Sequence, residues 1–436
     1  MRTSKDYIAT ANVGVTSKRY LMLGILCLIN LTDAIQFLEY SSIANLVTNY
    51  YQVSFSTVSL TAAIANVGSV VSVYPAAKIL EAYGMRFTLV IGSAIVILAA
   101  VLKCFVVNKS LFALILFAQF VAGVAFNFCF NVAPYMAAKW FRNNEASLVI
   151  GISSCMGNLA CSTCYILPSL FEQAKTDIQL ANGLSYLSIT MAVVSTICFF
   201  LVIVYIEEKP RQVANNAESR RFQNRESDTN SILNLLKNKN FILVSLSLIC
   251  VLTVKVSLNI LFNQIFFELF TDLAKITTIS GILYNVSTIF ATIIFPPILD
   301  RTKRFRLLTY STHLAALMAA ILFFIASRLR ITFFIYLTAF LCGLFLFGQQ
   351  VFLMDLIVEL TYPFPESTSV GLVVSISYLP SFGYTPFVSF IMEKFGILYA
   401  FLLLTMTLFL GFVPLLFVSF QLRRNQAENE TIPLIE

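Results

Sequence analysis

Twelve long runs of apolar residues, separated by shorter polar segments, are the feature that most limits how this chain can fold. Each run has the roughly 20 residues that an α-helix needs to cross the hydrocarbon core of a bilayer. Charged residues make up only 12% of the 436 positions, whereas a soluble domain has about a quarter. We therefore predict an all-α integral membrane protein with twelve transmembrane helices. The predicted spans are 20–47, 56–80, 86–107, 110–138, 146–170, 183–206, 241–269, 276–299, 305–327, 331–358, 368–392 and 396–420.

The placement of basic residues predicts that both termini lie in the cytoplasm. With that orientation the inner segments contain 21 of the 29 Lys and Arg residues, and the outer loops contain seven, Lys103 among them. An excess of Lys and Arg on the cytoplasmic side is the general rule for helical membrane proteins. One long polar break then divides the chain into two six-helix halves. The predicted domains are a cytoplasmic N-terminus (1–19), a first bundle (20–206), a cytoplasmic linker (207–240), a second bundle (241–420) and a cytoplasmic tail (421–436).

The two halves repeat a charged turn at equivalent places. Glu81 and Arg86 flank the turn after the second run, and Asp300 and Arg306 flank the turn after the eighth. Paired six-helix halves with such turns resemble the major facilitator superfamily. The resemblance implies that charges at cytoplasmic helix ends form an inner gate of salt bridges; the alternative is ordinary solvated charge. The candidate gating residues are Glu81, Arg86, Arg142, Asp300, Arg306, Asp355 and Glu359.

Longer segments narrow this resemblance to one family. The stretches APYMAAKWFRNNEAS (133–147) and DLIVELTYPFPESTSVGL (355–372) are the most specific, and DAIQFLEYSSIAN (33–45) matches more loosely. Together they resemble the feline leukaemia virus subgroup C receptor-related transporters over nearly the whole chain. Members of that family are described as transporters of choline and ethanolamine, with haem transport also claimed. The resemblance implies a transporter that alternates access to a central site.

The resemblance also indicates how a cation site would differ in this chain. Similar proteins use a Trp in helix 1 and a Tyr in helix 7, and the matching positions here are Phe37 and Val256. Their Gln residues in helices 5 and 11 correspond to Leu159 and Tyr378. Aromatic faces attract ammonium groups, and Trp does so best. The cage is therefore weaker here, which counts against choline itself, and we expect a small polar, amino-containing metabolite that is choline- or ethanolamine-like.

Two charged residues fall in the middle of apolar runs. Asp33 lies 14 residues past Arg19 and Lys255 lies 16 past Lys239, so both are about 21–24 Å beyond their cytoplasmic anchors. An isolated charge at that depth costs about 3 kcal/mol or more, and such residues normally pair or face a cavity. We expect Asp33 and Lys255 to pair. The pair is either a permanent clamp on a gate or a site that separates around a zwitterionic substrate.

Helical spacing extends the candidate binding site. Gln36, Phe37 and Tyr40 share a helical face with Asp33, and Asn259 shares one with Lys255. Any one of these polar side chains is more often an interhelical hydrogen-bond contact than a ligand. The candidate substrate-binding residues are Asp33, Gln36, Phe37, Tyr40, Asn127, Asn131, Lys255, Asn259, Gln264 and Tyr378.

The sequence offers little for catalysis or metal binding. The single His, His313, lies in an apolar run, and the Cys161–Cys164 pair has no cluster of His or carboxylates beside it. We expect no enzyme activity, no cofactor, no metal and no nucleic-acid partner. The expected state is a monomer whose partners are the bilayer and a small-molecule substrate.

Three further questions stay open from the sequence. Glu39 and Glu268, placed near the outer rim, form no clear proton relay with Asp33, so facilitated diffusion is favoured over proton coupling. The segment 430–435 has the spacing of an acidic dileucine signal, which sets an endolysosomal membrane beside the plasma membrane. The alternative functions are a haem transporter of the same family and a non-transporting membrane receptor or sensor.

Overall fold

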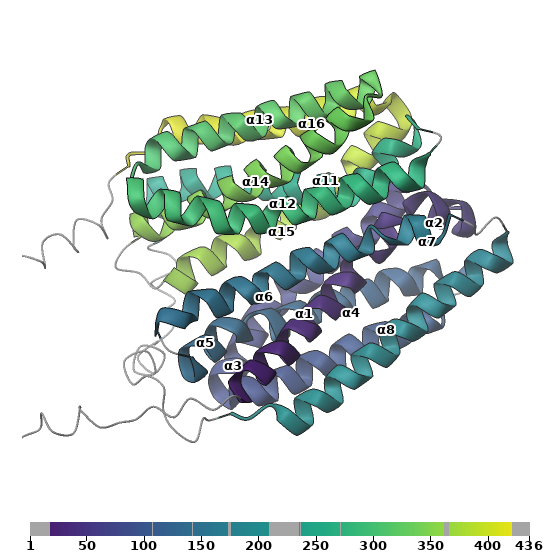
Figure 1. Ribbon diagram of the computed structural model, residues 1–436, viewed down its shortest axis with the longest axis horizontal. Coiled ribbons are helices and arrows are strands. Elements are labelled where there is room, and N and C mark those ends of the chain that lie inside the picture. The colour runs from purple at the N-terminus through teal and green to yellow at the C-terminus, as the bar shows by residue number, and fades with distance from the viewer. Residues whose placement is uncertain are drawn as a thin grey trace, which may run out of the picture.

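The computed structural model describes residues 18–106, 108–141, 143–172, 176–208, 235, 237–270, 272–361 and 366–420. Long α-helices dominate these residues and form two bundles, one from each half of the chain (Figure 1). The first bundle contains α1 (Lys18–Ser42), α2 (Ala44–Tyr51), α3 (Phe55–Cys104), a 3₁₀ turn (Lys109–Leu111), α4 (Phe112–Phe130), α5 (Val132–Trp140), α6 (Asn143–Cys164), α7 (Leu167–Leu170) and α8 (Asp177–Tyr205). The second contains α11 (Lys239–Phe267), α12 (Leu273–Thr302), α13 (Phe305–Leu329), α14 (Thr332–Thr361), α15 (Glu366–Phe395) and α16 (Ile397–Leu416).

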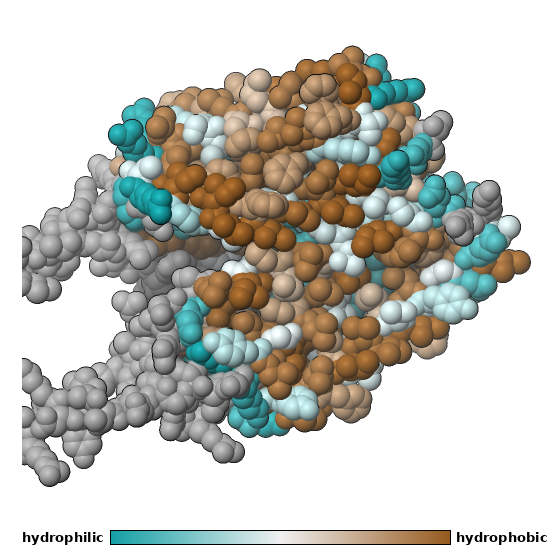
Figure 2. All heavy atoms as spheres, in the orientation of Figure 1, coloured by the Kyte–Doolittle hydropathy of each residue, from teal (hydrophilic) through white to brown (hydrophobic). Residues whose placement is uncertain are grey.

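The helices account for the predicted membrane crossings. Ten segments of the described chain are long and apolar enough to span a bilayer. One of them, α3, has 50 residues and crosses twice, because it folds back at Gly84. The 30-residue α15 is also of spanning length and completes the twelve. Figure 2 shows apolar side chains over the flank of both bundles and hydrophilic ones near the helix ends, as a bilayer requires.

Gly84 makes the return of α3 possible. Its φ of 82° lies where a side chain is strained, and a Cβ built on it would lie 2.2 Å from the carboxylate carbon of Glu208. That carboxylate accepts a hydrogen bond from the backbone N–H of Arg86 at 3.0 Å. The turn predicted between the second and third spans is therefore confirmed, and Glu208 occupies the space that only a glycine leaves.

Small residues bring α3 and α4 into close contact. A Cβ on Gly123 would lie 1.9 Å from the carbonyl oxygen of Ala65, and one on Gly68 would lie 2.3 Å from that of Phe120. The Ser69 hydroxyl donates to the Gly123 carbonyl at 3.1 Å. Glycines at a helix interface allow such approach inside a membrane, where van der Waals packing replaces the hydrophobic effect. This packing holds α3 tightly against α4.

Parts of the predicted domain scheme lie outside the described chain. These parts are residues 209–234 and 236 of the linker, residues 1–17 at the N-terminus and the whole tail 421–436. The exact domain limits stay predictions. Within the described chain, the predicted first span continues as a separate helix, because α1 ends at Ser42 and α2 starts at Ala44.

Candidate functional site

Lys255 lies on α11 where the two bundles meet. Its Nζ donates to Gln350 Oε1 of α14 at 2.8 Å and lies 4.3 Å from the centre of the Phe347 ring. Its backbone carbonyl accepts a hydrogen bond from the Tyr284 hydroxyl at 2.9 Å, which ties this turn of α11 to α12. The ammonium group is thus held in a fixed place by an amide and an aromatic face.

The other bundle supplies the opposite wall of this site. Cys161 of α6 lies close to the Asn259 side chain and within electrostatic range of Lys255 and of Tyr378 on α15. The hydroxyl of Tyr165, the residue directly after α6, donates to the Asn259 carbonyl and lies 3.2 Å from the Asn259 Oδ1. We define the central site by its half-buried members, which are Cys161, Lys255, Asn259, Phe347, Gln350 and Tyr378.

The predicted pair of Asp33 and Lys255 is not formed, so this prediction was wrong. Among the described residues, no carboxylate oxygen lies within 4.0 Å of the Lys255 ammonium. Asp33 is 5% exposed, and its basic neighbour is Lys103 of α3. The two charges were predicted at similar depth, but Asp33 points into the first bundle while Lys255 points between the bundles.

The remaining polar residues on that face of α1 also turn inward. Gln36 is fully buried and its amide donates to the Val96 carbonyl at 3.3 Å and to the Ser195 hydroxyl at 3.5 Å. Tyr40 is buried, with the Lys103 ammonium 5.7 Å from its ring centre. These contacts hold α1 against α3 and α8 rather than lining the space between the bundles.

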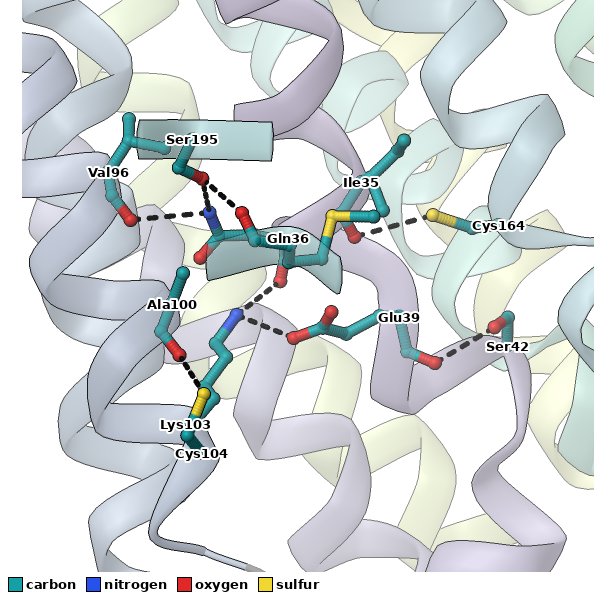
Figure 3. Close-up of polar contacts among 11 residues, drawn as sticks. Ile35, Gln36, Glu39, Ser42, Val96, Ala100, Lys103, Cys104, Cys164 and Ser195 are labelled. Carbon is teal, nitrogen blue, oxygen red and sulfur yellow. Dashed lines mark hydrogen bonds and ion pairs between the residues drawn. The ribbon is translucent and has the colours of Figure 1, made fainter. Parts of the chain in front are cut away.

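A buried ion pair that the sequence reasoning missed lies at this place (Figure 3). Lys103 Nζ is 2.6 Å from Glu39 Oε1, and the two side chains are 1% and 2% exposed. The same ammonium donates to the Gln36 carbonyl at 3.0 Å. Lys103 was expected in an outer loop, which was wrong. Glu39 was expected near the outer rim, and it lies in the last turn of α1 with its side chain buried. Lys103 instead belongs to the last turn of α3 and reaches inward to α1.

The opposite face of α1 meets the second bundle. Leu31, Ala34 and Phe37 are half-buried and pack against a cluster that consists mostly of second-bundle residues. Phe37 is thus the predicted α1 site residue that faces the other half. An aromatic side chain at this place is of the kind that attracts a cation.

Three other candidates lie at contacts between helices or at a helix end. Asn127 donates to the Ser69 carbonyl at 2.5 Å and to the Ser72 hydroxyl at 2.9 Å, so it ties α4 to α3. Gln264 donates to the Ser389 carbonyl at 3.0 Å and accepts from its hydroxyl at 2.6 Å, which ties α11 to α15. Asn131 is half-buried at the C-terminal cap of α4. The structure does not bring Asn127 and Gln264 into contact with Lys255.

The candidate gating residues differ in their contacts and in their exposure. The Arg86 guanidinium donates to the Ile203 carbonyl at 3.0 Å, and Glu81 lies 3.9 Å from Lys78 with both side chains exposed. Arg306 lies 5.7 Å from the Tyr310 ring centre, beside a hollow of about 550 Å³ at the N-terminal end of α13. Asp355 and Glu359 are half-buried on α14, and both have interaction partners. Arg142 and the side chain of Asp300 lie outside the described part.

Glu208 contacts three residues at the end of the first bundle that is predicted to face the cytoplasm. It accepts from the Tyr135 hydroxyl at 3.0 Å and lies 3.3 Å from the Lys139 ammonium, besides its bond to Arg86. Lys18 pairs in the same region with Glu207 at 2.5 Å. The sequence reasoning assigned residues 207 and 208 to the linker and so overlooked them. Their position directly after the last apolar residue of a span was the available signal.

Polar contacts join the two bundles on the side that is predicted to face outward. Asn263 of α11 donates to the Ser42 carbonyl at 3.0 Å and accepts from the Asn45 backbone N–H at 2.9 Å. Ser56 of α3 donates to the Pro386 carbonyl at 2.9 Å, and Ser169 bonds Thr278 at 2.8 Å. These residues lie at the helix ends remote from the N-terminal start of α1, which is predicted to be cytoplasmic. We call the Ser42, Asn45 and Asn263 contacts the outer latch.

Comparisons with known proteins agree with this architecture. The profile of the Major Facilitator Superfamily matches residues 25–382. The choline/ethanolamine transporter flvcr2a of Danio rerio is 25% identical over 95% of this chain and 89% of its own. FLVCR2 of Homo sapiens, also named a choline/ethanolamine transporter, is 24% identical over 96% and 81%.

Solved structures share the same fold. A D-xylose-proton symporter superposes with a TM-score of 0.72 at 13% identity, covering 92% of this chain and 97% of its own. A bacterial homologue of the human lysosomal transporter Spinster, inward-facing and occupied, gives 0.69 at 14% identity, over 93% and 97%.

Proposed function

The chain belongs to the major facilitator superfamily, and we propose that it carries a small polar, amino-containing solute across its membrane through the central site. It is a multi-pass membrane transporter, and its relatives over nearly the whole chain are named choline/ethanolamine transporters. Those names and the aromatic residues facing the bundle interface support an amine as the solute. We propose a choline- or ethanolamine-like metabolite.

The observation that carries the proposal is the position of the central site beneath the outer latch. Cys161 from the first bundle and Lys255, Asn259 and Tyr378 from the second are half-buried between the bundles. Above them, Asn263 closes the outer side through its bonds to Ser42 and Asn45. A site between two rigid bundles, closed on one side, is what alternating access requires.

The outer latch can open at modest cost. Its contacts are neutral hydrogen bonds, each worth about 0.5–1.5 kcal/mol in net terms. A conformational equilibrium between outward and inward states needs differences of only a few kcal/mol. We propose that the two bundles rock about the central site, which exposes it to each side in turn. The proposed transport is facilitative, driven by the solute gradient.

Uptake by the purified chain tests this proposal. The full chain is reconstituted in liposomes with labelled ethanolamine, choline, their phosphate esters and small amino acids outside. We expect saturable uptake of at least one amine that accelerates when unlabelled solute is placed inside. The variant Tyr378→Ala should reduce uptake without loss of folded protein. Folded wild-type protein that moves none of these solutes faster than empty liposomes would contradict the proposal.

A further inference from the structure

We propose that Lys255 binds an acidic group of the transported solute, a carboxylate or a phosphate. The inference rests on the proposed function in one respect, which is that the solute also carries an amino group. The substrate class is then a small zwitterion, in which an acidic group and an ammonium are joined by a short linker. This assignment differs from a simple cation of the choline type.

The first step of the argument is the incomplete coordination of Lys255. A lysine ammonium has three hydrogen-bond donors. Among the described residues, Gln350 Oε1 is its one hydrogen-bond acceptor, and the Phe347 ring covers another side. The side chain is half-buried and lies where Cys161 approaches from the other bundle. Donor capacity therefore remains on the side that faces the central site.

The second step excludes the acids of the protein as the missing partner in this conformation. Glu39 is already 2.6 Å from Lys103 inside the first bundle, and Asp33 is buried on the same side of α1. Charges inside a membrane are normally paired or face a functional cavity. Lys255 is not paired by a described carboxylate, so the function of its charge lies in what binds beside it at the central site.

The third step concerns the sign of the ligand. An ammonium ion close to Lys255 would be repelled, because charges are poorly screened in a buried site. An acidic group placed against Lys255 removes that repulsion and completes its hydrogen bonding with a charge-assisted bond. The rest of the wall is neutral, and Tyr378 there presents an aromatic ring that can receive the amino end. A zwitterion satisfies both ends of the site.

Binding measurements on matched ligands test this assignment. The purified full chain is titrated by calorimetry with four ligands. Ethanolamine carries an amine alone and propionate an acid alone, whereas phosphoethanolamine and β-alanine each carry both groups. We expect phosphoethanolamine or β-alanine to bind at least about tenfold more tightly than ethanolamine, as a charge-assisted hydrogen bond provides. Whichever of the two binds more tightly identifies the acidic group as phosphate or carboxylate.

Variants connect that preference to Lys255. Lys255→Gln should abolish the preference and bind ethanolamine at least as well as the wild type, while Lys255→Arg should keep it. Lys394→Gln removes a lysine that stacks on Phe390 and Phe395 at the C-terminal end of α15, and it should leave the binding preference unchanged. Size-exclusion profiles and thermal stability check folding. Lys255→Gln is expected to be at least as stable as the wild type, because it removes a buried charge.

The outcomes separate the two proposals. Tighter binding of ethanolamine than of both zwitterions by the wild type would overturn the role of Lys255 and leave an amine transporter. A zwitterion preference that survives in Lys255→Gln would overturn it as well. Binding of propionate that depends on Lys255, without transport of any amine, would keep the anion site and remove the proposed function. Absence of binding for all four ligands would overturn both.

Discussion

The buried ion pair between Glu39 and Lys103 gives the sharpest stability prediction. The two charges are 2.6 Å apart with exposures of 2% and 1%, so neither can be solvated when its partner is removed. Breaking a buried pair from one side typically costs about 3–5 kcal/mol. The cost for Glu39→Gln should fall at the lower end of this range, because Asp33 remains as a second acid near Lys103. Lys103→Met should fall at the upper end, because it leaves two carboxylates without their cation.

The double variant should recover part of this loss. Removing both charges leaves the Gln36 carbonyl without the Lys103 donor it now has at 3.0 Å, and it leaves Asp33 without its basic neighbour. An unsatisfied buried acceptor costs about 1–3 kcal/mol, so the double variant should be more stable than either single variant or equal to the milder one. The unfolding free energy can be followed by SDS titration, with the fluorescence of the single tryptophan, Trp140 in the first bundle, as the signal. A double variant that loses the sum of the two single losses would refute the pairing.

Three further predictions follow from close contacts. Gly123→Ala should destabilise the first bundle by about 1–3 kcal/mol in the same titration, since its Cβ would overlap the Ala65 carbonyl, whereas Gly151→Ala, which meets nothing within 4 Å, should not. Gly281→Ala should favour the conformation open to the outside, because its Cβ would lie 2.2 Å from the Tyr165 ring across the bundle interface. An impermeant thiol reagent should then label outer-side cysteines faster, and unchanged labelling would contradict this shift. Phe37→Trp should tighten amine binding about two- to fivefold, because Trp is the better cation–π partner, and unchanged affinity would place Phe37 outside the site.

The membrane spans were predictable because hydropathy and length determine them almost alone. The break between the second and third spans was also predictable, since Gly84 and the flanking charges mark a turn. Depth followed from the helical rise, which placed Asp33 and Lys255 at similar heights. Rise does not fix rotation about the helix axis, however. Packing turned Asp33 toward α3 and Lys255 toward α14, and that choice depends on neighbours far apart in sequence.

Lys103 illustrates a different limit of the sequence. A lysine at the end of an apolar run is normally read as a loop residue that faces water. Its long side chain instead reaches back into the bundle, because Glu39 on α1 offers a buried carboxylate there. Only the packing of α1 against α3 reveals that partner. Once the contact is known, the two isolated acids of α1 have a physical explanation that hydropathy alone cannot supply.

The central claim is that solute crosses between the two bundles as the outer latch opens and closes. Asn45 and Asn263 can be replaced together by cysteine in a chain whose nine native cysteines are removed, because their side chains are in contact, with Asn263 Nδ2 3.0 Å from Asn45 Oδ1. Solute exchange is then measured in liposomes before oxidation, after oxidation and after reduction. We predict that cross-linking stops exchange and that reduction restores it. Exchange at an unchanged rate in the cross-linked protein would contradict the account.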